Sequence, residues 1–219
     1  KALKPKISEL HIKPNNKIKP IFIVGMPRTG TTLVEKIITY DAKIQSLEET
    51  GLVPAFVNRV KGNDNPGSLN QMYRELYNTN NENFTDKDLF NFNYIEVIIN
   101  EFPNAKFVNC QREPKEVISS IFKNRLEAIP WAHSLDNIIE YYDQYLKVME
   151  IQRKRFGEFI IDIDHKELVS DSKYVTQKLF SFLGLRWSED CLKFHKNKSM
   201  YSQTLSQSQI RNGINSKYL

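Results

Sequence analysis

The sequence predicts an α/β fold in which a central parallel sheet is flanked by helices, giving three layers. Short apolar segments typical of buried strands alternate with longer helix-like segments from residue 19 onward. With 219 residues, of which 40% are apolar, the chain is long enough to bury the core of one such domain. In a sheet of this kind, ligands bind beyond the carboxyl ends of the strands.

The first strand is predicted over residues 19–24, because the apolar run Ile21–Val24 stops at Gly25. A helix is expected to follow over 31–40, and a short strand could precede Glu48. Segment 61–82 is predicted to be irregular around one short helix, and segment 196–217 is polar throughout. The remaining strands are predicted over about 83–86, 105–111 and 159–163, and the remaining helices over 52–60, 68–77, 89–101, 114–125, 135–155 and 171–183.

The loop between the first strand and the first helix is rich in groups that bind anions. The backbone N–H groups of residues 28–32, the threonine hydroxyls and the Arg28 guanidinium converge at a helix N-terminus, where the helix dipole favours negative charge. The lysine of the G-x-x-x-x-G-K-[ST] motif is missing, and Arg28 precedes Gly30. The loop therefore predicts a P-loop-type site for a nucleotide that carries a 5′ anhydride, in preference to ATP.

A second anion site is predicted where the strand 105–111 ends. Arg112 follows this strand, Pro114 suits the first turn of a helix, and Ser120 lies two turns further on. An arginine fork and a helical hydroxyl together can hold a phosphate group. An ion pair between Arg112 and Glu113 or Glu116 at the surface is the alternative explanation.

Charge and composition exclude several classes of function. The net charge is +5, but 31 basic and 26 acidic residues are interspersed, and we expect no nucleic-acid partner because no basic stripe follows the first 20 residues. No apolar run approaches the ~18 residues of a membrane span. The two cysteines are expected to be reduced, and no motif with metal-ligand spacing is present, so no metal is expected.

These motifs together resemble the sulfotransferase superfamily, which takes sulfate from 3′-phosphoadenosine 5′-phosphosulfate (PAPS). Residues 28–32 match the 5′-phosphosulfate loop of that family, and Arg112 with Ser120 matches its 3′-phosphate motif. The resemblance is strongest to the branch that contains tyrosylprotein sulfotransferases and bacterial enzymes linked to tetratricopeptide repeats. It implies a sulfotransferase domain over residues 19–219, and residues 1–18 are then a linker or the remnant of an upstream region.

The resemblance also implies which residues form the site. Glu48-Glu49-Thr50 is similar to the Glu-Glu-Thr of the tyrosylprotein branch, whose second glutamate is the general base. Glu49, Arg28 and Lys87 are accordingly the expected catalytic residues, although Glu48 and Glu49 could instead cap the helix that starts near Leu52. The residues expected to bind PAPS are Arg28, Thr29, Gly30, Thr31, Thr32, Arg112, Ser120, Ser206 and Arg211.

Some positions depart from the family pattern. His165-Lys166 stands where relatives carry a Tyr-Glu pair, and the closing Gly-x-Trp segment is only partly matched before Leu219, which leaves the completeness of the 3′-phosphate site open. Lys217 is a weak candidate to fill that site.

The expected activity is transfer of sulfate to a hydroxyl group of a tyrosine, a sugar or another alcohol. A catalytically silent nucleotide-binding module of the same fold and a P-loop phosphotransferase are the alternatives. We expect a cytoplasmic protein, with a Golgi-lumen location as the alternative.

Overall fold

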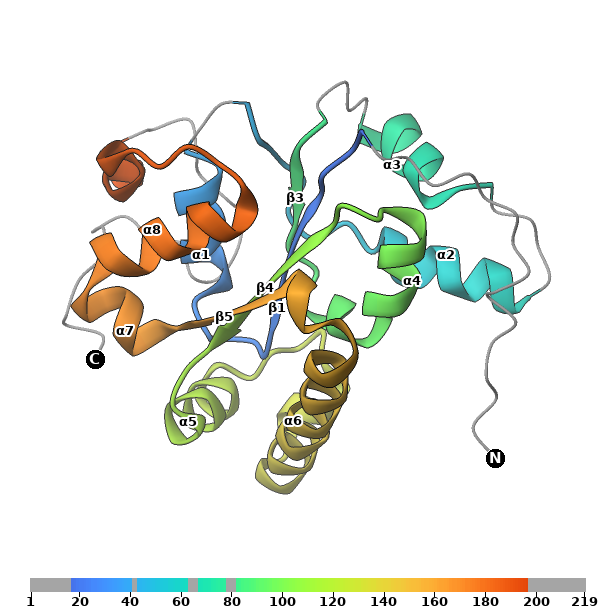
Figure 1. The fold of residues 1–219 in the computed structure, drawn as a ribbon. Coiled ribbons are helices and arrows are strands. Elements are labelled where there is room, and N and C mark those ends of the chain that lie inside the picture. The colour runs from blue at the N-terminus through green and yellow to red at the C-terminus, as the bar shows by residue number, and fades with distance from the viewer. Residues whose placement is uncertain (1–16, 41–42, 63–66, 78–81, 197–219) are drawn as a thin grey trace.

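Five parallel strands form a single sheet in the order β2-β3-β1-β4-β5. The computed structural model describes residues 17–40, 43–62, 67–77 and 82–196. This arrangement confirms the predicted fold class, a parallel sheet flanked by helices (Figure 1). The strands are β1 (Ile21–Gly25), β2 (Gln45–Ser46), β3 (Phe84–Asp86), β4 (Lys106–Gln111) and β5 (Ile160–Asp164).

Side chains of the central strand β1 alternate between two apolar cores. Ile21 and Ile23 pack with one buried cluster, whereas Phe22 and Val24 pack with the other. Because successive side chains of a strand point to opposite faces, both faces of the sheet are covered by helices. The register pairs Phe22 with Phe107 of β4, and their rings stack with centroids 5.5 Å apart.

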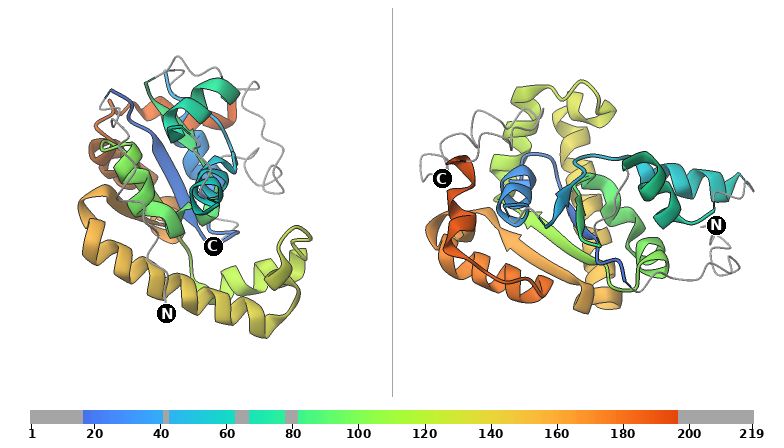
Figure 2. Two further views of the ribbon diagram at one scale, coloured as in Figure 1. Left: turned by 90° about the vertical axis from the view of Figure 1, so that its right-hand side faces the viewer. Right: turned by 90° about the horizontal axis from the view of Figure 1, so that it is seen from above.

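Helices α1 (Thr31–Ile38), α7 (His165–Ser170) and α8 (Ser172–Leu183) cover one face of the sheet (Figure 1). The other face packs against a larger group of helices, and Figure 2 shows the long helix α6 running along the outside of that layer. This group consists of α2 (Leu52–Lys61), α3 (Leu69–Tyr77), α4 (Ile95–Glu101), α5 (Pro114–Asn124) and α6 (Leu135–Phe156).

The predicted helix over 89–101 differs from the structure. Its first half is a 3₁₀ helix over Leu89–Tyr94, and only Ile95–Glu101 is α-helical. The Asp88 carboxylate accepts a hydrogen bond from the backbone N–H of Phe90 at 3.2 Å, which starts the tighter turn. The prediction also lacked α7, whose start is capped by Asp164.

Both cysteines are free and buried: Cys110 in β4 and Cys191 in the 3₁₀ helix Glu189–Lys196. Each belongs to the core between the sheet and α1, α7 and α8. Among the helices that the structure describes, none is both long enough and apolar enough to cross a bilayer.

The helices that follow β1 and β4 leave the sheet on opposite sides. Helix α1 packs on the face of Ile23, whereas α5 packs on the face of Phe22. A parallel sheet opens a crevice where neighbouring strands send their connections in opposite directions. The carboxyl ends of β1 and β4 therefore mark the place where a ligand is expected.

Candidate functional site

The loop after β1 is held tightly against the neighbouring strand. A Cβ added at Gly25 would lie 2.6 Å from the backbone oxygen of Cys110, so no side chain fits there without moving β4. The Thr29 hydroxyl donates to the carbonyl oxygen of Met26 at 2.7 Å and closes the turn. Arg28 and Gly30 both have positive φ, 71° and 94°, which turns the chain sharply into α1.

The structure brings the two predicted anion sites together. Nε of Arg28 donates to the Ser120 hydroxyl at 3.1 Å, although the two residues are 92 positions apart. Burial and, secondly, the positive charge of Arg112 lower the pKa of Arg28. Arg112 also pairs with Glu116 at 2.5 Å, so the surface ion pair considered from the sequence exists as well. Two guanidinium groups close enough to repel each other favour an anion between them.

His165 lies against the same loop from α7. A Cβ added at Gly30 would be 2.9 Å from Cδ2 of the imidazole, so the ring fills the space that a side chain there would need. Burial, followed by the charge of Arg112, lowers the pKa of His165 and favours the neutral ring. His165 thus stands where the family pattern has a tyrosine and contacts the anion loop.

A pocket of about 310 Å³ opens beside these groups. Thr29 and Arg112 line it together with Tyr142, Tyr145 and Lys166. The Tyr145 hydroxyl donates to Oδ1 of Asn109 at 2.7 Å, which fixes the ring between α6 and β4. The pocket therefore has Arg112 in its lining and one fixed aromatic wall.

Glu49 and Lys87 form an ion pair at the end of β3. Nζ of Lys87 donates to Oε1 of Glu49 at 3.0 Å. The lysine is buried, whereas the glutamate is exposed. Neither Glu48 nor Glu49 caps α2, because Gly51 is the N-cap and Thr50 accepts from the N–H of Leu52 at 3.1 Å.

A buried carboxylate anchors both members of this pair. Asp86 precedes Lys87 and accepts hydrogen bonds from the hydroxyls of Thr50 and Tyr73 and from the N–H of Asp88. Burial raises the pKa of Asp86 to about 6 against the opposing effect of these hydrogen bonds. Thr50 is adjacent to Glu49, so one network fixes the backbone on either side of the ion pair.

The sequence interpretation missed Glu35 of α1, which is fully buried. Its Oε1 accepts from Ser46 at 2.9 Å and from Thr85 at 3.1 Å, while Oε2 has no partner among the described residues. Burial raises its pKa, and the nearby charge of Lys87 is the largest opposing effect. A signal was present, because residues 31, 34, 35 and 38 follow the i, i+3, i+4, i+7 spacing of a buried helix face, and a glutamate there is unusual.

The remaining predicted residues divide into two groups. Thr31 and Thr32 are buried in the first turn of α1, directly after Gly30. Ser206, Arg211 and Lys217 lie outside the described residues, so the predicted closing part of the 3′ site is not described.

The sequence profile of the Sulfotransferase family matches residues 20–80 and 67–189 of this chain. A putative protein-tyrosine sulfotransferase of Caenorhabditis briggsae is 24% identical over 91% of the chain and 79% of that protein. Of five curated relatives that it matches, the chain spans 29 to 79% of their own length.

Solved structures support the same fold. The sulfotransferase domain from the curacin biosynthetic pathway aligns with a TM-score of 0.73 and 17% identity, over 93% of this chain and 90% of that one. A mouse sulfotransferase complexed with adenosine 3′,5′-bisphosphate (PAP) aligns with a TM-score of 0.58 and 15% identity, over 86% of this chain and 68% of that one.

Proposed function

Because the chain belongs to the sulfotransferase family, we propose that it transfers the sulfuryl group of PAPS to the hydroxyl group of an acceptor. The acceptor oxygen forms a bond to sulfur while the bond from sulfur to the 5′-phosphate oxygen breaks, and PAP leaves. The observation that carries this proposal is the meeting of Arg28, Ser120 and Arg112 at the crevice between β1 and β4.

In this proposal, the two ends of the nucleotide bind to different elements. The loop 28–32 and the N-terminus of α1 hold the 5′ end through backbone N–H groups and the buried threonines. Arg112 and Ser120 hold the 3′-phosphate. An anion suits this place, because burial and, secondly, the charge of Arg112 lower the pKa of Arg28, and a negative charge near both guanidinium groups would oppose both effects.

Glu49 takes the proton of the acceptor hydroxyl as the oxygen attacks. Its exposed carboxylate can reach an acceptor, while Lys87 holds it from the buried side. In this proposal, the Lys87 ammonium also shares the negative charge that develops on the transferred group. Peptide tyrosine is the first acceptor to test, because the relative from Caenorhabditis briggsae is named for it.

Calorimetric titration with PAP and with ATP tests the nucleotide assignment. We expect PAP to bind more tightly than ATP, and Arg112→Gln to weaken PAP binding by about tenfold or more because a charged hydrogen-bond partner is lost. Arg59→Gln is the matched control. Arg59 is exposed on α2, so this substitution removes the same charge at a place away from the crevice. Tighter binding of ATP, or equal PAP affinity of both variants, would contradict the assignment.

A PAPS turnover assay with a tyrosine peptide, a phenol and a sugar then tests catalysis. Tight PAP binding without transfer to any of the three acceptors would favour the silent nucleotide-binding module over the enzyme.

A further inference from the structure

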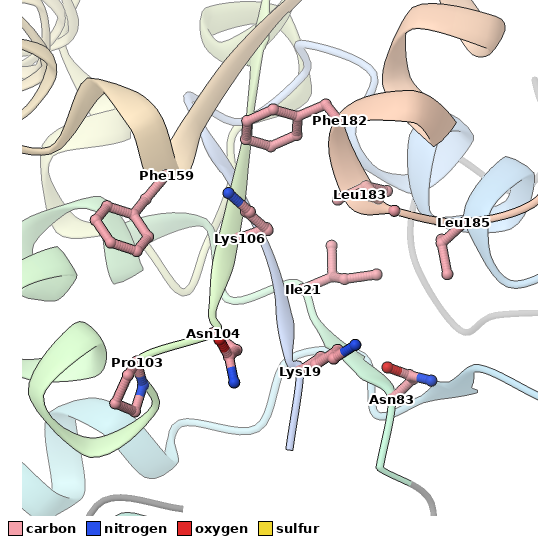
Figure 3. A pocket seen from close by; sticks show the side chains of 11 residues that line it. Lys19, Ile21, Asn83, Pro103, Asn104, Lys106, Phe159, Phe182, Leu183 and Leu185 are labelled. Carbon is pink, nitrogen blue, oxygen red and sulfur yellow. The ribbon is translucent and has the colours of Figure 1, made fainter. Parts of the chain in front are cut away.

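A second pocket, of about 290 Å³, lies at the amino-terminal edge of the sheet (Figure 3). It is lined by residues at the start of β1 and β4, by the segment before β5, and by the end of α8. The arginine pair lies at the carboxyl ends of the strands, so this pocket is at the opposite edge and is independent of the proposed nucleotide site.

One wall of the pocket is a lysine at the start of β4, where the pattern of buried residues predicts an apolar side chain. The register pairs Lys106 with Ile21, and both point to the face that Val108 and Cys110 fill further along β4. At this position the alternation along β4 calls for another apolar side chain. Lys106 instead places an ammonium group at the end of that core where β4 begins.

The Lys106 side chain is held in one place by two aromatic rings. Its Nζ lies 4.8 Å from the ring centroid of Phe182 and 5.4 Å from that of Phe159, and Figure 3 shows it between them. Nζ also donates to the backbone oxygen of Glu158 at 3.1 Å. A lysine fixed in this way loses little further freedom when an anion binds beside it.

Within residues 17–40, 43–62, 67–77 and 82–196, no carboxylate pairs with the lysines of the pocket. Lys19 and Lys106 contribute two positive charges to its lining, and no acidic side chain of the described residues lines it. Ile21 and Leu185 supply an apolar wall next to these charges.

We propose that this pocket binds a small amphiphilic carboxylate, whose charged head lies beside the ammonium group of Lys106 and whose apolar chain packs on Ile21, Phe182 and Leu185. The volume is at the low end of the range for ligand sites, which suits a ligand of this size. Lys106 attracts the head, and the aromatic and aliphatic wall buries the chain.

Titration of the whole chain with octanoate, followed by amide NMR, tests this proposal. We expect saturable shifts at the amides of residues that line the pocket, and binding about tenfold weaker for octan-1-ol, which has the same chain without the charge. PAP in excess should leave the octanoate affinity unchanged. A failure of the sulfotransferase proposal would not alter this result.

Two variants separate the charge from the packing. Lys106→Met keeps the stem between the rings, so we expect octanoate to bind about tenfold more weakly while octan-1-ol binds at least as well as before. Lys147→Gln, at an exposed position of α6, is the matched loss of charge and should change neither affinity. The proposal is overturned if octanoate gives no saturable shift, if both ligands bind the native chain equally, or if the shifts fall on residues 26–32.

Discussion

Lys87 and Glu49 differ sharply in exposure, although their charged atoms are 3.0 Å apart: the lysine side chain is 1% exposed and the glutamate 57%. The charge of Lys87 also acts on the buried carboxyl group of Glu35, whose pKa it lowers against the effect of burial. At the residue scale, Lys87 is therefore the buried member of the pair, and Glu49 is the member that an acceptor can reach.

Glu49→Gln tests the proposed base. The amide keeps the size of the side chain but cannot accept the acceptor's proton, so we expect turnover with PAPS to fall by about 100-fold or more while PAP affinity stays nearly unchanged. Glu48→Gln, one position earlier, removes the same charge and should retain most of the activity. Equal turnover of the two variants would remove Glu49 from the mechanism.

Asp86 should make stability depend on pH. Its pKa is about 6 in the folded chain, against an ordinary value of 3.8. Between these values the folded state keeps a proton that the unfolded state has lost, so the free energy of unfolding should fall by about 3 kcal/mol in total as the pH rises from well below 3.8 to well above 6. The contribution is complete below this window and lost above it.

Urea denaturation at pH 4 and pH 7 measures this effect, with Asp86→Asn as the comparison. Asparagine does not titrate. The stability of the native chain relative to the variant should therefore be higher at pH 4 than at pH 7. A difference that is the same at both pH values would mean that folding does not raise the pKa of Asp86.

At the scale of single elements, the loop after β1 depends on the imidazole that packs against it from α7. Gly30→Ala would place a methyl group 2.9 Å from the ring of His165 at a φ of 94°. The loop or the ring must move, so we expect PAP affinity to fall by about tenfold.

Gly51→Ala is the matched control, because Gly51 has φ 65° but no heavy atom within 4 Å of the added Cβ. That variant carries backbone strain without a clash, and PAP affinity should be kept. Adding His165→Ala to Gly30→Ala should recover part of the lost affinity. If it recovers none, backbone strain alone accounts for the effect.

All five strands were expected from the sequence, and helix α7 was not. The apolar run that ends at Gly25 marks β1, and Pro114 marks the start of α5. Strand β2 agrees with the short strand expected before Glu48, but only its pairing with β3 shows that it has two residues. Helix α7 has six residues and begins where the Asp164 carboxylate accepts from the N–H of Glu167 at 2.9 Å.

At the scale of the whole molecule, the sheet holds the two cores together through its central strands. Phe107 is fully buried and its ring stacks on Phe22 across β1 and β4. Phe107→Ala should lower the free energy of unfolding by about 3–5 kcal/mol, because it removes a large buried side chain and leaves a cavity. Urea denaturation measures this loss.

Phe122→Ala in α5 is the control, because Phe122 is 49% exposed and its removal leaves no enclosed cavity. We expect a change of less than about 1 kcal/mol for this variant. A loss as small for Phe107→Ala would show that the core relaxes around the missing ring.

Assembly of the candidate site followed from the fold class rather than from any local motif. A parallel sheet brings the loops after β1 and β4 to one edge, which is why Arg28 reaches Ser120. The burial of Lys87 could not be predicted, because it depends on how the segment after β3 packs in three dimensions. The functional roles of Glu49, Arg28 and Lys87 stay predictions until the variants are measured.

The burial of both thiols has a practical consequence for labelling. Burial raises the pKa of Cys110 and Cys191, so little thiolate forms at neutral pH and alkylating reagents cannot reach the sulfur atoms. A single cysteine introduced on the surface would therefore react selectively with a maleimide dye in the otherwise native chain. Fluorescent reporters of ligand binding could be attached without first replacing either natural cysteine.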